Sequence, residues 1–442
     1  MTRKSPVGGG KPFDPNFPQN RYPVTPGIDE LLKQVPLCRF SLDGLTDEVD
    51  VQDVEPNSLL GNTRRRTSGT GIAPRLPLTS GGPTFSLERM AQNLRSALDD
   101  NAKGWAFVIN RNGEAAADGA GGRAIDNNDM DSSGILVGGR DFTIDTRVNV
   151  ASVSKHVTAL ATLRLMQALG LSRFDLILPW LPRGQPYGSR VDELTFRHLF
   201  THHSGLVSTN SNFSQTLTDQ GVFAALAAGA NPTDPDTAPD DYKNVNYAVF
   251  RLIIPALWRE AGQPLANADD PSASAFFYTA YVATQLFPLF GGNIGDESLL
   301  TALGDETARY YSTSDSIIGA DFPNYFFWGG PAGWHLSARE LAAILAFTAY
   351  TDDIIPAPIR DIMDDELLGW RPTNGAFGRY VGHGGSIDHL FGNSVRNRVR
   401  AAVMKFPIQV EAAFVANSLV DNAPATGGSA ALLQRAYDNA WV

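Results

Sequence analysis

The sequence predicts an α+β fold, in which an antiparallel sheet is flanked by helices and interrupted by an inserted all-helical lobe. Strand patterns occur near both ends of the chain, in a hairpin at 105–117 and in two runs at 398–405 and 412–419. The long section 179–323 between them is rich in Ala, Pro and aromatic residues and shows helical patches. The last strands of the chain are therefore expected to join the first hairpin in one sheet.

The first element is a helix capped by Ser86. Its apolar residues recur at helical spacing: Leu87, Met90, Ala91, Leu94 and Leu98. The hairpin follows, with strands at 105–109 and 114–117 joined by an Asn112-Gly113 turn. At the other end of the chain, a closing helix is expected over 429–441.

A second helix carries the most informative motif of the chain, Ser152-Val153-Ser154-Lys155. Apolar residues continue behind the motif to Leu169, and Gly170 then ends the helix. Positions i and i+3 share a helix face, so the Ser152 hydroxyl and the Lys155 amine are neighbours. A lysine accepts the proton of a serine only when burial or a helix N-terminus disfavours its ammonium form.

The lysine of this motif is one of only seven in the chain, against 29 arginines. A Ser-x-x-Lys pattern is weak by itself, and its weight comes from four later motifs that follow in a particular order. Tyr242 and Asn244 are two residues apart and can reach one cavity, although an isolated Tyr-x-Asn is more often an ordinary loop. The other three motifs are 199–206, 330–334 and the glycine-rich run 382–386.

With these ordered motifs, residues 100 to 440 resemble the serine β-lactamase and penicillin-binding-protein superfamily. The similarity is to its class C-like branch of esterases and D-aminopeptidases. The resemblance implies the β-lactamase/transpeptidase-like fold. It also implies a sheet domain made of 85–178 and 324–442 and a helical lobe at 179–323. The Pro- and Gly-rich arm at 1–84 has no counterpart in the superfamily.

The resemblance also assigns roles to individual residues. Ser152 is the nucleophile that carries the acyl group, and Lys155 and Tyr242 share the acid and base work, with Tyr242 as a phenolate held by the lysine. The backbone N–H groups of Ser152 and Ser386 form the oxyanion hole. The remaining residues line the substrate pocket: Asn244, His383, Gly384 and Gly385.

The chain departs from the superfamily pattern at 383–385. True β-lactamases and transpeptidases carry Lys-Thr-Gly there, whereas this chain has His383-Gly384-Gly385. The residues before this motif, 377–381, are expected to form a strand that enters a sheet edge. A neutral imidazole anchors an anion less well than an ammonium does. The departure favours neutral or amine-bearing esters and amides over substrates recognised through a carboxylate.

Adjacent histidines in the 199–206 motif suggest a metal at first sight. The side chains of His202 and His203 diverge, and no acidic residue or Cys stands at i+3 or i+4 to complete a site. The motif resembles a structural turn of the superfamily, with His202 hydrogen-bonded internally. The Gly-rich turn 330–333 is expected to border the site without taking part in the chemistry. We therefore expect neither a metal nor a cofactor.

Composition narrows the choice of partners and location. A net charge of −11 and a pI near 5.1 argue against nucleic acids and anionic membranes. No apolar leader or run of 18 apolar residues is visible, and there is one cysteine, Cys38, so a cytoplasmic protein is expected. The arm 1–84 holds eleven of the 28 prolines, and we expect it to dock on its own body or on a second subunit in a homo-oligomer.

Other functions remain open at this point. A Ser-His-Asp hydrolase of the α/β type would need Gly-x-Ser-x-Gly, and no serine of the chain has that surrounding. A β-lactamase, or a penicillin-binding sensor that is acylated with little turnover, would keep Ser152 and Lys155. The residues do not choose between ester hydrolysis, amide hydrolysis and acyl transfer. An enzyme that cleaves an ester or amide through an acyl group on Ser152 is the function that we predict.

Overall fold

The computed structural model describes residues 83–130, 133–207, 218–263, 265, 270–290, 307–321, 325–391, 394–421 and 428–442. The expected arm 1–84 lies outside the described residues, except for its last two. Thr84 exchanges two backbone hydrogen bonds with Val442, with N···O distances of 2.7 and 3.0 Å. The start of the described chain is thereby held against its C-terminus.

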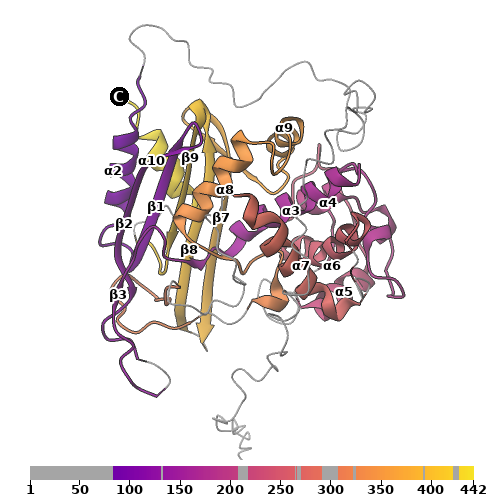
Figure 1. Ribbon diagram of the computed structural model, residues 1–442, viewed down its shortest axis with the longest axis horizontal. Helices are drawn as coiled ribbons and strands as arrows, with labels where there is room; N and C mark the ends of the chain where they lie inside the picture. Colours follow the sequence, from indigo (N-terminus) through magenta and orange to yellow (C-terminus); the bar gives the residue numbers. More distant parts are fainter. Residues whose placement is uncertain are drawn as a thin grey trace, which may run out of the picture. The chain divides into compact units, whose positions relative to one another are not determined.

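The central sheet contains seven antiparallel strands among the described residues, so the expected α+β class is confirmed (Figure 1). Segments from the two ends of the chain meet in it, because β1 pairs with both β2 and β9. The order across the sheet is β3 (Arg140–Asp141), β2 (Glu114–Ile125), β1 (Gly104–Arg111), β9 (Val410–Ala416), β8 (Ser394–Phe406), β7 (Gly378–Phe391) and β6 (Arg371–Gly375).

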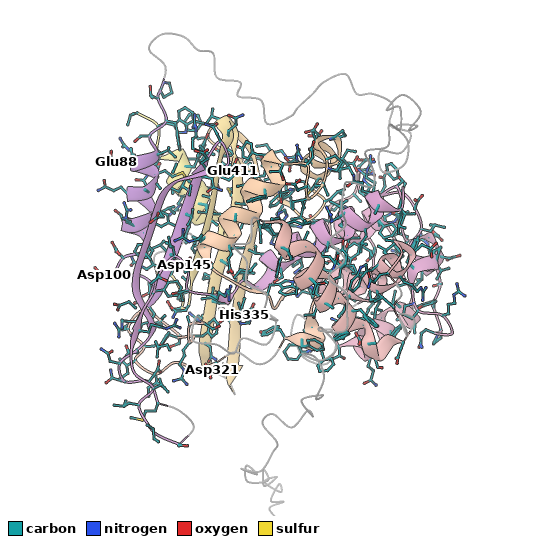
Figure 2. The ribbon with its side chains drawn as sticks, in the orientation of Figure 1. Glu88, Asp100, Asp145, Asp321, His335 and Glu411 are labelled. Carbon is teal, nitrogen blue, oxygen red and sulfur yellow. The ribbon has the colours of Figure 1, made fainter. Side chains whose placement is uncertain are left out.

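Helices cover both faces of this sheet (Figure 1). On one face, α2 (Leu87–Leu98) and α10 (Ala430–Asp438) form a core with the strands, in which Leu94, Phe107 and Tyr437 are fully buried. Ser86 caps α2 by accepting a hydrogen bond from the Arg89 N–H, as predicted. On the other face, α8 (Ala338–Tyr350) packs on β9 and β1. The Tyr350 hydroxyl at its end donates to Glu411 of β9, which Figure 2 labels.

The helices of the middle section stand beside α3 (Ser154–Ala168), which packs on α6. They are α4 (Phe196–Phe200), α5 (Asp219–Ala228), α6 (Asn244–Glu260) and α7 (Ser274–Tyr281), and α9 (Ala357–Asp365) follows α8. A two-stranded ladder of β4 (Val148–Asn149) and β5 (His335–Leu336) precedes the Ser152 turn. No helix in the described part of the chain is long and apolar enough to cross a membrane.

One expectation about the sheet is wrong. The strand at 377–381 was expected at a sheet edge, but β7 extends to Phe391 and has neighbours on both sides. The edge is β6, which pairs Arg371 with Gly382 and turns into β7 at Gly375–Gly378. β6 reads Arg-Pro-Thr-Asn-Gly and lacks alternating apolar residues, so its strand conformation depends on pairing with β7.

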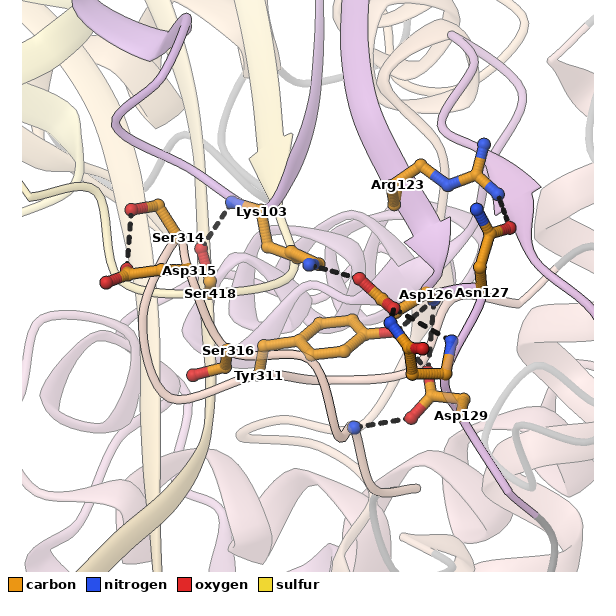
Figure 3. A network of polar contacts seen from close by, with 12 residues as sticks. Lys103, Arg123, Asp126, Asn127, Asp129, Tyr311, Ser314, Asp315, Ser316 and Ser418 are labelled. Carbon is orange, nitrogen blue, oxygen red and sulfur yellow. Dashed lines mark hydrogen bonds and ion pairs between the residues drawn. The ribbon is translucent and has the colours of Figure 1, made fainter. Parts of the chain in front are cut away.

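A buried polar network joins the turn after β2 to the segment 307–321 (Figure 3). Asp129 is fully buried and accepts from the backbone N–H of Gly319 at 2.6 Å, from the Tyr311 hydroxyl and from the Asp126 N–H. Asp126 in turn accepts from Lys103 Nζ at 2.5 Å. Since every oxygen of Asp129 has a donor, the carboxylate holds the two loops together.

Candidate active site

Ser152 lies in a single turn of 3-10 helix, Ala151–Val153, immediately before α3. The residue before it, Ala151, has a φ of +49°, which a residue with a side chain adopts rarely. Two hydrogen bonds hold this conformation. The Ala151 N–H donates to Asn149 Oδ1 at 2.8 Å, and the Val150 N–H donates to the carbonyl of Trp334 at 2.8 Å. The fold thus fixes the backbone that presents the serine.

Lys155 lies one turn further on and is completely buried. Its Nζ is 3.0 Å from Ser152 Oγ, 2.7 Å from Asn244 Oδ1 and 2.9 Å from the carbonyl oxygen of Pro331. Burial, and then the positive charge of Arg371, hold the pKa of Lys155 well below its usual value. The desolvation expected from the apolar helix is present, and it favours a neutral amine.

The contacts of this amine determine where its lone pair points. A neutral lysine has two N–H donors and one lone pair, whereas an amide oxygen and a backbone carbonyl can only accept. Asn244 and Pro331 therefore take the two N–H groups. In this neutral form the third contact, with Ser152 Oγ, is left to the lone pair, and the serine hydroxyl donates to the lysine, whereas the ammonium form donates to Ser152 Oγ. The neutral form is the one that proton removal from Ser152 requires.

Tyr242 completes the triad from a loop that precedes α6. Its hydroxyl donates to Ser152 Oγ at 2.9 Å, and its ring lies 4.4 Å from the ring of His202 and 5.0 Å from Lys155 Nζ. Burial raises the pKa of Tyr242 to about 12, although the hydrogen bond with Ser152 and the charge of Arg371 oppose that rise. The residue keeps 37% of its surface exposed. At neutral pH it is a phenol, not the phenolate expected from the sequence.

Asn244 is the first residue of α6, two residues beyond Tyr242. Its side-chain oxygen accepts from Lys155. The amide oxygen therefore holds the lysine, and contact of Asn244 with a substrate stays a prediction. Tyr242 and Asn244 both reach the Ser152–Lys155 pair because the loop ends at Lys243 and α6 begins at Asn244.

Strand β7 packs against the Ser152 turn and brings the glycine-rich motif to the site. Gly385 faces the turn, because a Cβ atom placed there would lie 2.2 Å from the Val150 carbonyl oxygen. Gly384 and Ser386 face the opposite side of the sheet, where Ser386 Oγ is 2.8 Å from Ser429 Oγ. The two glycines thus allow close packing of protein on protein. The oxyanion role of the Ser152 and Ser386 N–H groups stays a prediction.

His383 shares the face of Gly385 and is almost completely buried. Its ring lies 6.3 Å from that of Tyr242, and its Nδ1 is 2.8 Å from the Gly384 carbonyl oxygen. Burial, together with the charge of Lys155, lowers the pKa of His383 to about 3. The imidazole is therefore uncharged at neutral pH, and it contributes no cation to the site.

The histidine pair of the 199–206 motif supports Tyr242. His202 Nδ1 is 3.2 Å from the Lys243 carbonyl oxygen, and burial holds its pKa well below the usual value. His203 contacts Thr201 and the Ala238 carbonyl instead. Within the described ranges, no group of three or more His, Cys, Asp or Glu side chains is arranged to hold a metal ion. His202 is thus an internally bonded residue against the ring of Tyr242.

Sequence reasoning missed two features of the site. The Gly-rich turn at 330–333 borders the site as expected, but the sequence did not indicate that its Pro331 carbonyl accepts a hydrogen bond from Lys155. Arg371 places its guanidinium carbon 5.2 Å from the ring centroid of Tyr242 and pairs with Asp240. Only the nearness of Asp240 to Tyr242 in the chain could have suggested this pair.

A cavity of about 320 Å³ lies next to these residues. His202, Asp240 and Arg371 line it together with Trp370 and Glu366. Glu366, the residue after α9, forms ion pairs with Arg173 and with Arg197 of α4. These ion pairs connect the end of α9 to the segment 173–197. Ser152 is not among the lining residues, and the cavity therefore adjoins the site from the side of His202 and Arg371.

The sequence model of the Beta-lactamase family matches residues 90–404, most of the chain. The chain belongs to this family. No curated protein matches it in sequence.

Solved structures share the fold of this Beta-lactamase family member at low identity. A D-stereospecific amidohydrolase from Streptomyces sp. is 18% identical, with 80% of this chain and 98% of that chain covered and a TM-score of 0.56. A D-amino acid amidase from Ochrobactrum anthropi SV3 is 15% identical, with 79% and 97% covered and a TM-score of 0.56. An octameric penicillin-binding protein homologue from Pyrococcus abyssi is 17% identical, with 79% and 75% covered and a TM-score of 0.54.

Proposed function

We propose that the protein is a serine hydrolase that cleaves an ester or amide through an acyl-enzyme on Ser152. One observation carries the proposal. Ser152 Oγ lies within hydrogen-bond distance of a buried amine, Lys155 Nζ at 3.0 Å, and of a phenol, Tyr242 OH at 2.9 Å. A base and an acid on the same nucleophile are what acyl transfer to and from a serine needs.

The geometry supports the following sequence of steps. Lys155 takes the Ser152 proton as Oγ bonds to the substrate carbonyl carbon, and a tetrahedral oxyanion forms. When the bond to the leaving group breaks, Tyr242 gives its proton to the departing atom, and the Lys155 ammonium returns a proton to the tyrosine. Water then attacks the ester on Ser152 with the same residues working in reverse. We assign the oxyanion to the N–H groups of Ser152 and Ser386.

For the substrate, we propose an uncharged or amine-bearing acyl group, such as a D-amino amide or a simple ester. The uncharged His383 supports this choice, because it offers no cation at 383 to a substrate carboxylate. Arg371 is already paired with Asp240. Two structures of the same fold are named a D-stereospecific amidohydrolase and a D-amino acid amidase.

Intact-protein mass spectrometry tests the proposal. The protein is incubated with a p-nitrophenyl ester, a D-alanine amide and nitrocefin, and product release is followed in parallel. Wild type should gain one acyl group on Ser152 and turn over at least one of the first two compounds. Ser152→Ala should form no adduct, and Tyr242→Phe should keep the fold but lose roughly a hundredfold or more in turnover.

Each outcome has a clear reading. A Ser152→Ala variant that keeps a rate close to wild type would refute the assignment of the nucleophile. A stoichiometric burst with nitrocefin and no further product from any compound would replace the hydrolase with the alternative, an acylated sensor. Full turnover of nitrocefin alone would make the protein a β-lactamase.

A further inference from the structure

We propose that the ion pair of Arg371 and Asp240 controls how easily Lys155 is protonated. The guanidinium opposes a second positive charge on the lysine, and Asp240 sets how strongly it does so. This inference rests on the proposed function, because it assigns to Arg371 the task of keeping the base of that reaction ready.

The pair joins the sheet to the loop that carries the tyrosine. Arg371 begins the edge strand β6 and lies opposite Gly382 of β7 in the register. Asp240 stands two residues before Tyr242 and accepts a hydrogen bond from Arg371 NH1. The ion pair therefore fixes the loop that carries Tyr242, and it also places the charge of Arg371 next to the Tyr242 ring.

The distances put this charge within reach of the lysine. Arg371 Cζ and Lys155 Nζ lie 5.2 and 5.0 Å from the same point, the centroid of the Tyr242 ring, and are therefore no more than about 10 Å apart. An arginine in a protein stays protonated at every ordinary pH. After burial, its charge is the second cause that lowers the pKa of Lys155.

The other titratable groups around Lys155 do not supply a comparable charge. His202, from the turn after α4, and His383, from β7, are buried and uncharged at neutral pH. Asn244 on α6 is neutral. Of the residues that the structure describes, only Lys155 and Arg371 place a cation over the Tyr242 ring.

Carboxylates face Arg371 from its own side of the site. Asp240 is its ion-pair partner, and Asp241 pairs with Lys243 on the same loop. Three further carboxylates line the cavity that Arg371 also lines: Asp236, Asp365 and Glu366. Two of these, Asp236 and Glu366, are paired with Arg197. Asp240 is thus the carboxylate placed to cancel part of the Arg371 charge.

The signs of the expected effects follow from Coulomb's law. Replacing Arg371 by Met removes the cation and leaves Asp240, so protonation of Lys155 becomes easier and the base is lost at a higher pH. Replacing Asp240 by Asn frees the full charge of Arg371 and makes protonation harder. The two variants should therefore move the acid limb of kcat/KM in opposite directions.

The experiment measures kcat/KM against pH, with the p-nitrophenyl ester as probe, for wild type, Arg371→Met, Arg371→Lys and Asp240→Asn. At about 10 Å and an effective dielectric constant near 20, we expect Arg371→Met to raise the apparent pKa of the acid limb by about one pH unit. Asp240→Asn should lower it. Arg371→Lys keeps the charge and should return the limb most of the way to wild type.

Salt provides a second readout. The side chains of Arg371 and Asp240 keep 39% and 35% of their surface exposed, so solvent ions reach the pair. The difference between the apparent acid-limb pKa values of Arg371→Met and Asp240→Asn should shrink as ionic strength rises.

A merely structural tether predicts a different pattern. Both variants would then lose kcat together, with their acid limbs unchanged, and that result would overturn the inference. Circular dichroism and thermal unfolding show whether Arg371→Met still folds, and Asp240→Asn tests the sign independently if it does not. If wild type forms no adduct on Ser152, the proposed function fails; if it forms one and the limbs do not separate, this inference alone fails.

Discussion

Gly385 provides the sharpest test of how the fold positions the nucleophile. A Cβ atom at this residue would lie 2.2 Å from the Val150 carbonyl oxygen and 3.2 Å from the Ala151 Cβ. Real Cβ atoms essentially never come closer than 3.0 Å to another atom, so Gly385→Ala must displace β7 or the turn by roughly 1 Å. The Val150 carbonyl also accepts from the Val153 N–H. Its displacement therefore moves the turn that carries Ser152.

Two effects of different size are expected from this substitution. Overpacking of a close contact typically costs about 1 to 3 kcal/mol of the free energy of unfolding. A displacement of about 1 Å at a reacting atom can cost roughly a hundredfold in rate. Urea unfolding measures the first quantity, and kcat/KM with a p-nitrophenyl ester measures the second. We expect the loss of activity to exceed what the loss of stability explains.

Gly384→Ala is the matched control, one residue away on the same strand. Its Cβ atom would face α10, where the nearest atom is the Ala430 nitrogen at 3.3 Å. We expect this variant to lose less than about 1 kcal/mol of unfolding free energy and much less activity than Gly385→Ala. The reasoning is wrong if Gly385→Ala stays within threefold of wild type, or if the two variants are equally damaged.

Two further predictions concern buried charged groups. Because the pKa of Lys155 is lowered in the folded state, the unfolded chain binds a proton that the folded chain does not, from that lowered pKa up to about 10.4. The unfolding free energy of wild type should therefore rise with pH relative to that of Lys155→Met, by up to about 1.4 kcal/mol per pH unit in the range between those two pKa values. Parallel curves in urea titrations at different pH would contradict a lowered pKa of Lys155. Asp129→Ala leaves the Gly319 N–H and the Tyr311 hydroxyl without the acceptor that Asp129 provides and should cost about 2 to 4 kcal/mol. Asp129→Asn, which keeps an acceptor oxygen, should recover part of this in the same unfolding experiment.

Much of the arrangement could be predicted from local sequence patterns. The Ser86 cap, the apolar spacing of α2 and the Asn112-Gly113 turn each identify their element through residues that are close in the chain. The nearness of Ser152 and Lys155 follows in the same way, because both stand within one helical turn. The order of four motifs then indicated the superfamily, and the family match and the sheet agree with it.

Other features depend on residues that are distant in the chain. The edge strand β6 has no strand pattern of its own and exists through its pairing with β7. Burial raises the pKa of Tyr242 above its ordinary value, and the contacts of the Lys155 amine depend on acceptors at Asn244 and Pro331. A sequence pattern records neither desolvation nor the contacts of a backbone carbonyl.

The sequence by itself therefore determined which groups carry the chemistry: an alcohol, an amine and a phenol, each on an element that local patterns identify. Only the tertiary structure decided their protonation and their supports, including the Arg371 and Asp240 pair beside Tyr242. The physical reason is that helix and turn preferences act between near neighbours in the chain. Desolvation and Coulomb interactions depend instead on whatever the fold brings within about 10 Å.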